Sequence, residues 1–127
     1  LSLIDKLALA PHLDKRIGTL SGGTRQKLNA VVAMLFRPAV LVLDEPTAGL
    51  DPRASAILKD HVTRATLGGA TVLLTSHIVS ELEDLAQDLV FLVEGGVEFH
   101  GSVDSLKARA GETKLERVLA GMLEGRS

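Results

Sequence analysis

The sequence predicts an α/β fold in which a mostly parallel β-sheet is flanked by helices. Two short apolar runs, AVLVL at 39–43 and ATVLLT at 70–75, fit strands that are buried on both faces, as in a parallel sheet. Longer amphipathic segments, which fit helices, alternate with the apolar runs, and the turns between helices and strands are short. We expect right-handed crossovers in such a fold, with ligands at the carboxyl ends of the strands.

The first third of the chain is predicted to be mainly helical. A short helix at 2–9 is followed by a charged connector that runs through His12 and Arg16. A second helix spans 24–36, because its apolar residues recur at the spacing of one helical face, and Pro38 stops it. The residues of that face are Leu28, Val31, Val32, Leu35 and Phe36.

The middle of the chain predicts a longer helix and a second strand. Asp51 followed by Pro52 is typical of an N-cap with proline at the first helical position. Gly68-Gly69 ends this helix. Its apolar stripe consists of Ala54, Ile57, Leu58, His61, Val62 and Ala65. After the strand at 70–75 comes a helix that carries Ile78, Val79, Leu82 and Leu85.

The last third predicts a hairpin and two helices. Apolar runs at 89–93 and 97–100 flank Gly95-Gly96, a pair that is typical of hairpin turns. Both helices have predicted caps, which are Ser102 for the helix at 103–110 and a capping box of Thr113 and Glu116 for a helix through Met122.

The composition excludes several classes of function. Of the 127 residues, 46% are hydrophobic and 24% are charged, which is typical of a globular protein. A net charge of −2 argues against a basic nucleic-acid-binding module and a polybasic membrane binder, and with 2% aromatic residues no base-stacking platform is expected. The absence of cysteine excludes disulfides and thiolate sites. The most apolar region, 30–43, is interrupted by Arg37 and Pro38 and is too short to span a bilayer.

Two polar stretches lie where a phosphate ligand would bind. Ser21, Gly22 and Gly23 directly precede a helix, whose free N–H groups and dipole favour an anion. Asp44 and Glu45 follow a buried strand, where Asp44 can hold Mg²⁺ and Glu45 can orient or deprotonate an attacking water. The structural alternatives are an ordinary serine cap with a glycine turn, and a solvated acidic turn.

A third polar stretch is LLTSHI at 73–78. His77 follows a strand at the same predicted sheet edge as the acidic pair, and it could hydrogen-bond a terminal phosphate or the attacking water. A structural histidine at a strand-to-helix turn is the alternative. The other histidines show no metal-ligand spacing and are interpreted as surface or packing residues; they are His12, His61 and His100.

The order and spacing of these stretches resemble the C-terminal half of an ABC-type ATPase, the nucleotide-binding subunit of ABC transporters. LSGGTRQKL at 20–28 resembles the signature motif, and AVLVLDEP at 39–46 resembles the Walker B strand. AGLD at 48–51 resembles the D-loop, and TSH at 75–77 resembles the switch histidine. Thr24 departs from the family pattern, because many members have glutamine there. The resemblance is greatest to bacterial exporter-type members.

The resemblance implies a P-loop NTPase-like fold with ATP and Mg²⁺ as cofactors. Ser21 and Gly23 would contact the γ-phosphate of ATP held by a partner subunit, and Gly22 would shape the turn. Asp44 would serve the Mg²⁺ site, directly or through water, and Glu45 would be the general base for hydrolysis.

Two further residues acquire roles from the same resemblance. Asp51 would couple the two ATP sites across the dimer, and His77 would sense the γ-phosphate. In domain terms, 1–38 would be part of the helical signature subdomain, 39–111 the C-terminal part of the ATPase core, and 112–127 a C-terminal helix.

The sequence contains no G-x-x-x-x-G-K-[ST] motif, so the Walker A half of the fold is missing from it. We expect the chain to be a fragment that carries half of each composite site, while the absent part supplies central strands of the sheet. The isolated segment is therefore expected to bind little ATP and to be inactive.

The function that the resemblance implies is ATP hydrolysis in an ABC membrane transporter, of the exporter type. The expected partners are a second ATPase subunit, identical or different, and transmembrane transporter subunits; nucleic acid is not expected. The protein would be located at the cytoplasmic face of the cell membrane and would contact the membrane only through its partners. Two alternatives stay open, namely a soluble non-transporter ABC-type ATPase and a truncated regulatory partner without catalysis. Cargo and transport direction are not encoded in these residues.

Overall fold

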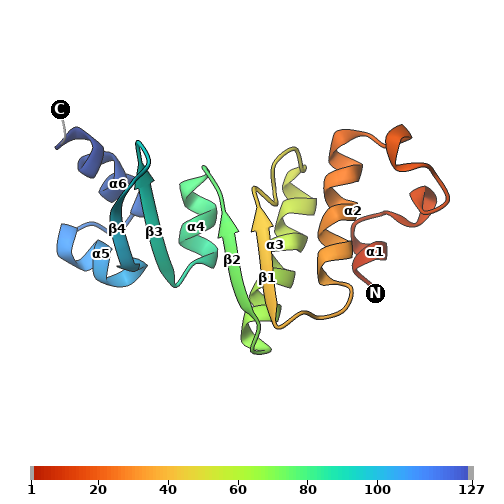
Figure 1. Cartoon of the computed structure of the whole chain (residues 1–127), viewed down its shortest axis with the longest axis horizontal. Coiled ribbons are helices and arrows are strands. Elements are labelled where there is room, and N and C mark those ends of the chain that lie inside the picture. Colours follow the sequence, from red (N-terminus) through yellow and green to blue (C-terminus); the bar gives the residue numbers. More distant parts are fainter. Residues whose placement is uncertain (1, 126–127) are drawn as a thin grey trace. The chain divides into compact units, whose positions relative to one another are not determined.

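The computed structural model describes residues 2–125 (Figure 1). The chain divides into two compact units, Leu1–Ser76 and His77–Ser127. Both units combine helices with strands, so the predicted α/β class is confirmed. No helix within the described residues has the length and apolar character that crossing a membrane requires.

Within residues 2–76, the first unit contains three α-helices, two short 3₁₀ turns and two strands. In chain order they are α1 (Leu3–Lys6), η1 (Ala10–His12), η2 (Ile17–Thr19), α2 (Gly22–Met34), β1 (Val40–Asp44), α3 (Pro52–Leu67) and β2 (Thr71–Thr75). The first helix is shorter than the predicted 2–9, because Ala8 has a φ of +55° that no α-helix accommodates.

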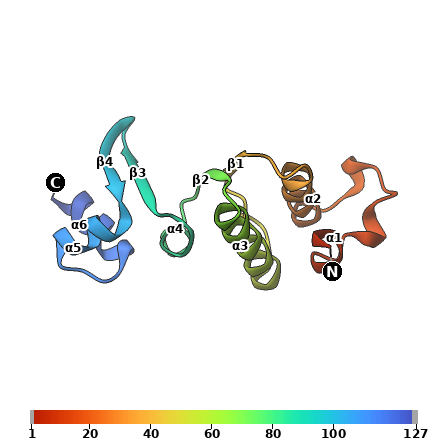
Figure 2. The same ribbon diagram turned by 90° about the horizontal axis from the view of Figure 1, so that it is seen from below.

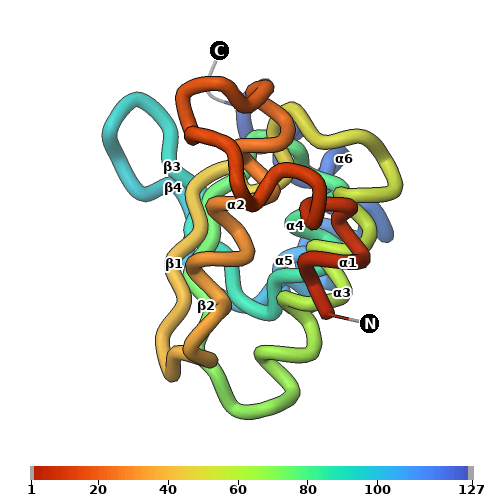
Figure 3. The backbone as a smooth tube through the Cα atoms, turned by 90° about the vertical axis from the view of Figure 1, so that its right-hand side faces the viewer, coloured from red at the N-terminus to blue at the C-terminus, as the bar shows by residue number. Residues whose placement is uncertain are grey.

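The two strands of this unit form a parallel pair, as predicted. Their register runs from Val40 opposite Thr71 to Asp44 opposite Thr75, so both strands end at the same level. Figure 3 shows the two strand traces running side by side. The helix α3 connects them, with Asp51 as its N-cap, Pro52 at its first position and Gly68 as its C-cap, as the sequence predicts.

Only one face of this strand pair is covered within the unit, where α3 lies against it (Figure 2). Leu41 and Leu43 of β1 are buried, whereas Val40 and Val42 are 63% and 65% exposed. The prediction of burial on both faces is therefore wrong for these strands as they stand in the structure. An apolar run alone cannot distinguish a strand covered on one face from one covered on two.

The apolar face predicted for α2 is only partly buried. Val31 packs in a cluster with Leu7, Leu9 and Ala54, but Val32 and Leu35 are exposed and Phe36 lies beyond the helix at 87% exposure. The buried side of α2 instead includes the small residue Ala30. The spacing thus predicts the helix, with both ends two residues later than in the structure. It misplaces the packed face, because it does not show where the neighbouring helices lie.

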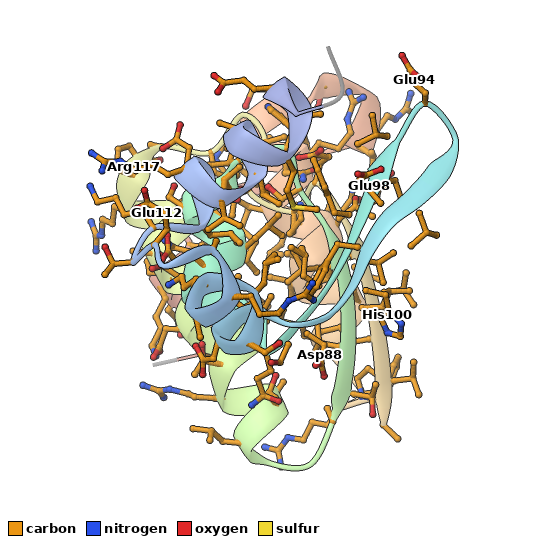
Figure 4. The ribbon with its side chains drawn as sticks, turned by 90° about the vertical axis from the view of Figure 1, so that its left-hand side faces the viewer. Asp88, Glu94, Glu98, His100, Glu112 and Arg117 are labelled. Carbon is orange, nitrogen blue, oxygen red and sulfur yellow. The ribbon has the colours of Figure 1, made fainter. Side chains whose placement is uncertain are left out.

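As far as the structure describes it, to residue 125, the second unit consists of a helix, a hairpin and two further helices. They are α4 (Val79–Leu85), β3 (Asp88–Val93), β4 (Gly96–Ser102), α5 (Val103–Ala110) and α6 (Leu115–Glu124). β3 and β4 are antiparallel. Their turn consists of Glu94 and Gly95, whose φ values of +50° and +80° suit a tight hairpin turn, and Figure 4 shows Glu94 at the tip. The predicted hairpin is confirmed, with its turn one residue earlier than Gly95-Gly96.

The core of this unit lies between the hairpin, α5 and α6, which Figure 2 shows on one side of the hairpin. Ser102 caps α5 by accepting a hydrogen bond from the Ser105 backbone N–H at 3.1 Å, as predicted. The buried residues of the core are Leu89, Val103, Leu106, Leu115, Val118 and Leu119.

The capping box predicted for the last helix is wrong. The N-cap of α6 is Lys114, one residue after Thr113, and its side chain makes no capping hydrogen bond. Glu83 of α4 accepts a hydrogen bond from the Leu115 backbone N–H at 3.4 Å instead. A carboxylate that is distant in sequence therefore takes the place of the local cap.

Candidate functional site

The carboxyl edge of the β1–β2 pair carries the acidic dipeptide. Thr75, the last residue of β2, donates a hydrogen bond from Oγ1 to Oδ1 of Asp44. The Glu45 backbone N–H is 3.0 Å from the Thr75 carbonyl oxygen and 3.2 Å from Thr75 Oγ1. Both carboxylates therefore leave the sheet edge at a position fixed by the neighbouring strand.

Glu45 itself has a φ of +46°, in the left-handed region that residues other than glycine seldom occupy. The chain turns sharply here, since the Ala48 N–H donates to the Glu45 carbonyl oxygen at 3.1 Å and the Leu50 N–H donates to the Thr47 carbonyl oxygen at 3.1 Å. Thr47 is buried within this turn. Unusual backbone conformations of this kind gather at functional sites, where the surroundings hold them in place.

The N-terminus of α2 is a second part of the site. Ser21 is its N-cap, and its Oγ accepts a hydrogen bond from the Thr24 N–H at 3.1 Å while donating to Thr24 Oγ1 at 2.8 Å. First-turn N–H groups have no partner within a helix, so those of Gly22 and Gly23 are available to an anion. The predicted serine-and-glycine helix start is present, although its ligand stays a prediction.

The start of α2 lies directly against the loop that follows β1. Gln26 donates from Nε2 to the carbonyl oxygens of Glu45 and Pro46 at 2.9 and 3.0 Å. Lys27 Nζ is 3.8 Å from Oδ2 of Asp51. The structure therefore brings the signature-like stretch and the acidic stretch together within the first unit.

Gln26 is the residue of this site that sequence reasoning missed. Its amide was visible only as part of LSGGTRQKL, where it carries no chemical role of its own. Its partners are 19 and 20 residues further along the chain. The only available signal was a neutral amide donor in the first turns of a helix that begins at a candidate phosphate site.

Asp51 caps α3 and faces the same loop. Its Oδ1 accepts a hydrogen bond from the Ala54 N–H at 2.9 Å. That bond, with a smaller contribution from Lys27, holds the pKa of the Asp51 carboxyl below its usual value. The side chain is therefore ionised in the neutral range, as a helix cap and as a partner for a cation.

His77 starts the second unit, two residues after the end of β2. Its side chain is exposed. The predicted convergence of His77 with Asp44 and Glu45 stays a prediction, as does its role toward a phosphate.

The donor set at the sheet edge fits Mg²⁺ bound with a nucleotide. Within the described residues no three His, Cys, Asp or Glu side chains form a metal-binding group. Mg²⁺ in nucleotide sites is commonly held by one or two carboxylates, water and the substrate phosphates. The exposed carboxylate of Asp44 can serve as such a single ligand, directly or through water.

A family model described as "AAA domain, putative AbiEii toxin, Type IV TA system" matches residues 16–83. The matched stretch contains every residue of the candidate site described above, from Ser21 to His77. It also spans the elements from η2 to the first part of α4.

The relatives of this chain include a phospholipid-transporting ATPase and an ATP-binding protein of daunorubicin resistance. The human phospholipid-transporting ATPase ABCA3 is 41% identical over 105 residues, which cover 83% of this chain and 6% of that protein. The daunorubicin resistance ATP-binding protein DrrA3 of Streptomyces coeruleorubidus is 39% identical over 117 residues, which cover 92% of this chain and 37% of that protein.

A solved structure described as an ATP-binding subunit of an ABC transporter superposes with a TM-score of 0.87 at 28% sequence identity. The match covers 95% of this chain and 51% of that subunit. The chain thus spans about half the length of the solved subunit, and a smaller share of the two relatives above.

Proposed function

Because the chain belongs to the AAA-domain family and, through its relatives and its fold, to the ATP-binding proteins of ABC transporters, we propose that it forms part of an ATPase that powers transport across a membrane. The observation that carries this proposal is the sheet edge where Thr75 fixes Asp44 and Glu45, with α2 held against it by Gln26. This arrangement supports the proposal because a helix N-terminus, which can bind an anion, and a candidate base lie in one folded unit.

Glu45 acts as the general base in this proposal. Its carboxylate accepts a proton from the water that attacks the γ-phosphorus of ATP, and the bond from that phosphorus to the bridging oxygen of ADP breaks. Asp44 would hold Mg²⁺, directly or through water, and the ion would neutralise charge on the phosphate oxygens. His77 hydrogen-bonds the γ-phosphate and orients the water.

Ser21 and the N–H groups that begin α2 serve a different nucleotide from Glu45. Ser21 and Gly23 contact the γ-phosphate held by a second ATPase subunit, while Gly22 shapes the turn. The positive end of α2 stabilises the charge of that phosphate. Asp51 lies at the junction of the two subunits and couples their sites.

These roles assign each segment of the chain to a part of the ATPase. Residues 1–38 belong to the helical signature subdomain, 39–111 to the ATPase core and 112–127 to a C-terminal helix. The loop that holds the β- and γ-phosphates must come from outside these 127 residues, since no stretch has its motif. The isolated chain is accordingly inactive.

The working complex is a dimer of ATPase subunits attached to transmembrane subunits, at the cytoplasmic face of the cell membrane. Support for the exporter type comes from the relatives whose names state phospholipid transport and daunorubicin resistance. Closure of the dimer around ATP supplies the mechanical step.

The proposal is tested by Glu45→Gln in the P-loop-containing protein that carries this chain. We expect ATP hydrolysis to fall at least about a hundredfold, because the amide cannot accept the proton, while ATP-driven dimerisation persists. Phosphate release measures the first effect and size-exclusion chromatography with ATP the second. A suitable control is Glu94→Gln, since Glu94 also follows a strand with positive φ but lies at a hairpin tip. Unchanged hydrolysis in Glu45→Gln would exclude Glu45 as the base.

A further inference from the structure

Gln26 connects α2 to the backbone of the candidate base. Its Nε2 donates to the Glu45 carbonyl oxygen at 2.9 Å and to the Pro46 carbonyl oxygen at 3.0 Å. A primary amide carries two N–H donors, so both are used on consecutive peptide groups. The side chain is half-buried. It therefore holds one short stretch of main chain that directly follows β1.

The stretch that Gln26 holds is conformationally unfavourable. Glu45 has a φ of +46°, which the surroundings must maintain for a residue with a Cβ. The Glu45 N–H donates a hydrogen bond to the Thr75 carbonyl oxygen at 3.0 Å. The Glu45 carbonyl oxygen accepts hydrogen bonds from Gln26 Nε2 and from the Ala48 N–H. The peptide groups on both sides of the Glu45 Cα are thus anchored, and they set the direction in which its side chain leaves the chain.

On the basis of the proposed function, we propose that Gln26 is a positioning residue that holds the Glu45 backbone in the orientation needed for hydrolysis. Gln26 lies five residues after Ser21 on the same helix. Its two hydrogen bonds therefore connect the helix that begins after Ser21 with the backbone of the candidate base.

Substitutions that separate hydrogen bonding from packing test this role. Met and Lys have unbranched side chains of similar width, but only Lys has N–H donors. In the P-loop-containing protein that carries this chain, we expect Gln26→Met to lower kcat for ATP hydrolysis about tenfold, an increase of about 1.4 kcal/mol in the barrier. The KM for ATP should stay within about twofold, because Gln26 binds backbone and not nucleotide.

Gln26→Lys should retain a kcat at least about threefold above that of Gln26→Met, since its ammonium can donate to the same carbonyl oxygens. The kcat of Gln26→Glu should be as low as that of Gln26→Met, because the carboxylate cannot donate a hydrogen bond to the two carbonyl oxygens that it faces. The matched control is Asn29→Asp, the same amide-to-acid change at an exposed position of α2, which should keep the wild-type kcat. Rates are normalised to the folded fraction from thermal unfolding.

A wild-type kcat in Gln26→Met, an equal kcat in Gln26→Met and Gln26→Lys, or a loss that lies wholly in KM would each overturn the role. If Gln26→Glu does not fold, the Met and Lys pair still decides. The proposed function fails separately, if Glu45→Gln hydrolyses ATP like the wild type. An inactive Glu45→Gln together with a fully active Gln26→Met rejects only the role of Gln26.

Discussion

Gly22 and Gly23 begin the same helix but have different surroundings. A Cβ atom on Gly23 would lie 3.2 Å from the Gly49 carbonyl oxygen, whereas a Cβ on Gly22 would meet no atom within 4 Å. The Gly49 oxygen is backbone and belongs to the loop between β1 and α3, so it cannot rotate away as a side chain can. Gly23 therefore allows α2 to approach that loop closely. No such steric contact requires a glycine at position 22.

The two alanine substitutions should differ in stability. We expect Gly23→Ala to be less stable than Gly22→Ala by about 1 kcal/mol or more, because the added methyl group crowds the Gly49 carbonyl. Gly22→Ala should be as stable as the wild type or more stable, since alanine favours the helix. Chemical denaturation of the P-loop-containing protein measures both. Equal stability of the two variants would show that the loop yields to the methyl group without cost.

Among the elements of the second unit, α4, α5 and α6 are linked by one carboxylate. Glu83 of α4 forms an ion pair with Lys107 of α5 and accepts the Leu115 N–H at the start of α6. The hydrogen bond from Lys107, and to a smaller extent that from Leu115, lowers the pKa of the Glu83 carboxyl below its usual 4.5. The ionised form of Glu83 is thus favoured by the folded state.

This pKa shift predicts the direction of a pH effect. A carboxyl whose pKa is lower in the folded state adds stability above pH 4.5, and that stability is lost as the pH falls through the folded-state pKa. We expect Glu83→Gln to unfold at a lower temperature than the wild type at pH 7, and the difference to disappear in acid. Circular dichroism melts from pH 7 to pH 3 measure it.

The control for this effect is Asp88→Asn, which changes an exposed carboxylate at the start of β3 (Figure 4). The difference in unfolding temperature between Asp88→Asn and the wild type should not follow the same pH profile. A further ion pair of this unit, between Arg117 and Glu112, is looser at 4.0 Å and highly exposed on the arginine side. A difference between Glu83→Gln and the wild type that is constant with pH would contradict the role of Glu83.

Local signals in the sequence were sufficient for most elements and insufficient for their packing. The Asp51–Pro52 start of α3 and the Ser102 cap of α5 depend on residues three apart, which a sequence displays directly. The cap of α6 comes instead from Glu83, 32 residues before Leu115. Periodicity likewise predicted α2 but not the exposure of Val32, because burial depends on neighbours that periodicity does not identify.

The same limit applies to the candidate site. Asp44 and Glu45 were predictable because they end an apolar run, and chain order placed them at the carboxyl edge of a parallel pair. The contact of Gln26 with the Glu45 carbonyl was not, since a glutamine in a helix gives no sign of a partner 19 residues away. Backbone strain at Glu45 was also invisible, because glutamate has no preference for positive φ.

At the scale of the whole molecule, we propose that the ATP site also uses residues from outside this chain. Within residues 2–125 of this chain, each of the two strand pairs exposes apolar residues on one face, as Val42 at 65% and Leu92 at 63% show. The solved relative is about twice as long as the matched segment. A complete ATP site on this proposal combines Glu45 of one subunit with Ser21 of another, so one chain serves two nucleotides.

The most direct test of this claim uses tandem dimers of the P-loop-containing protein, with Glu45→Gln and Ser21→Asp as the two substitutions. Aspartate keeps the helix cap of α2 but repels a phosphate. With one substitution in each half, we expect ATP hydrolysis to persist, because one site retains both its base and the opposite signature serine. With both substitutions in the same half, each site is damaged and hydrolysis should be lost. The reverse result would contradict the claim, because it would mean that Ser21 and Glu45 act on the same nucleotide.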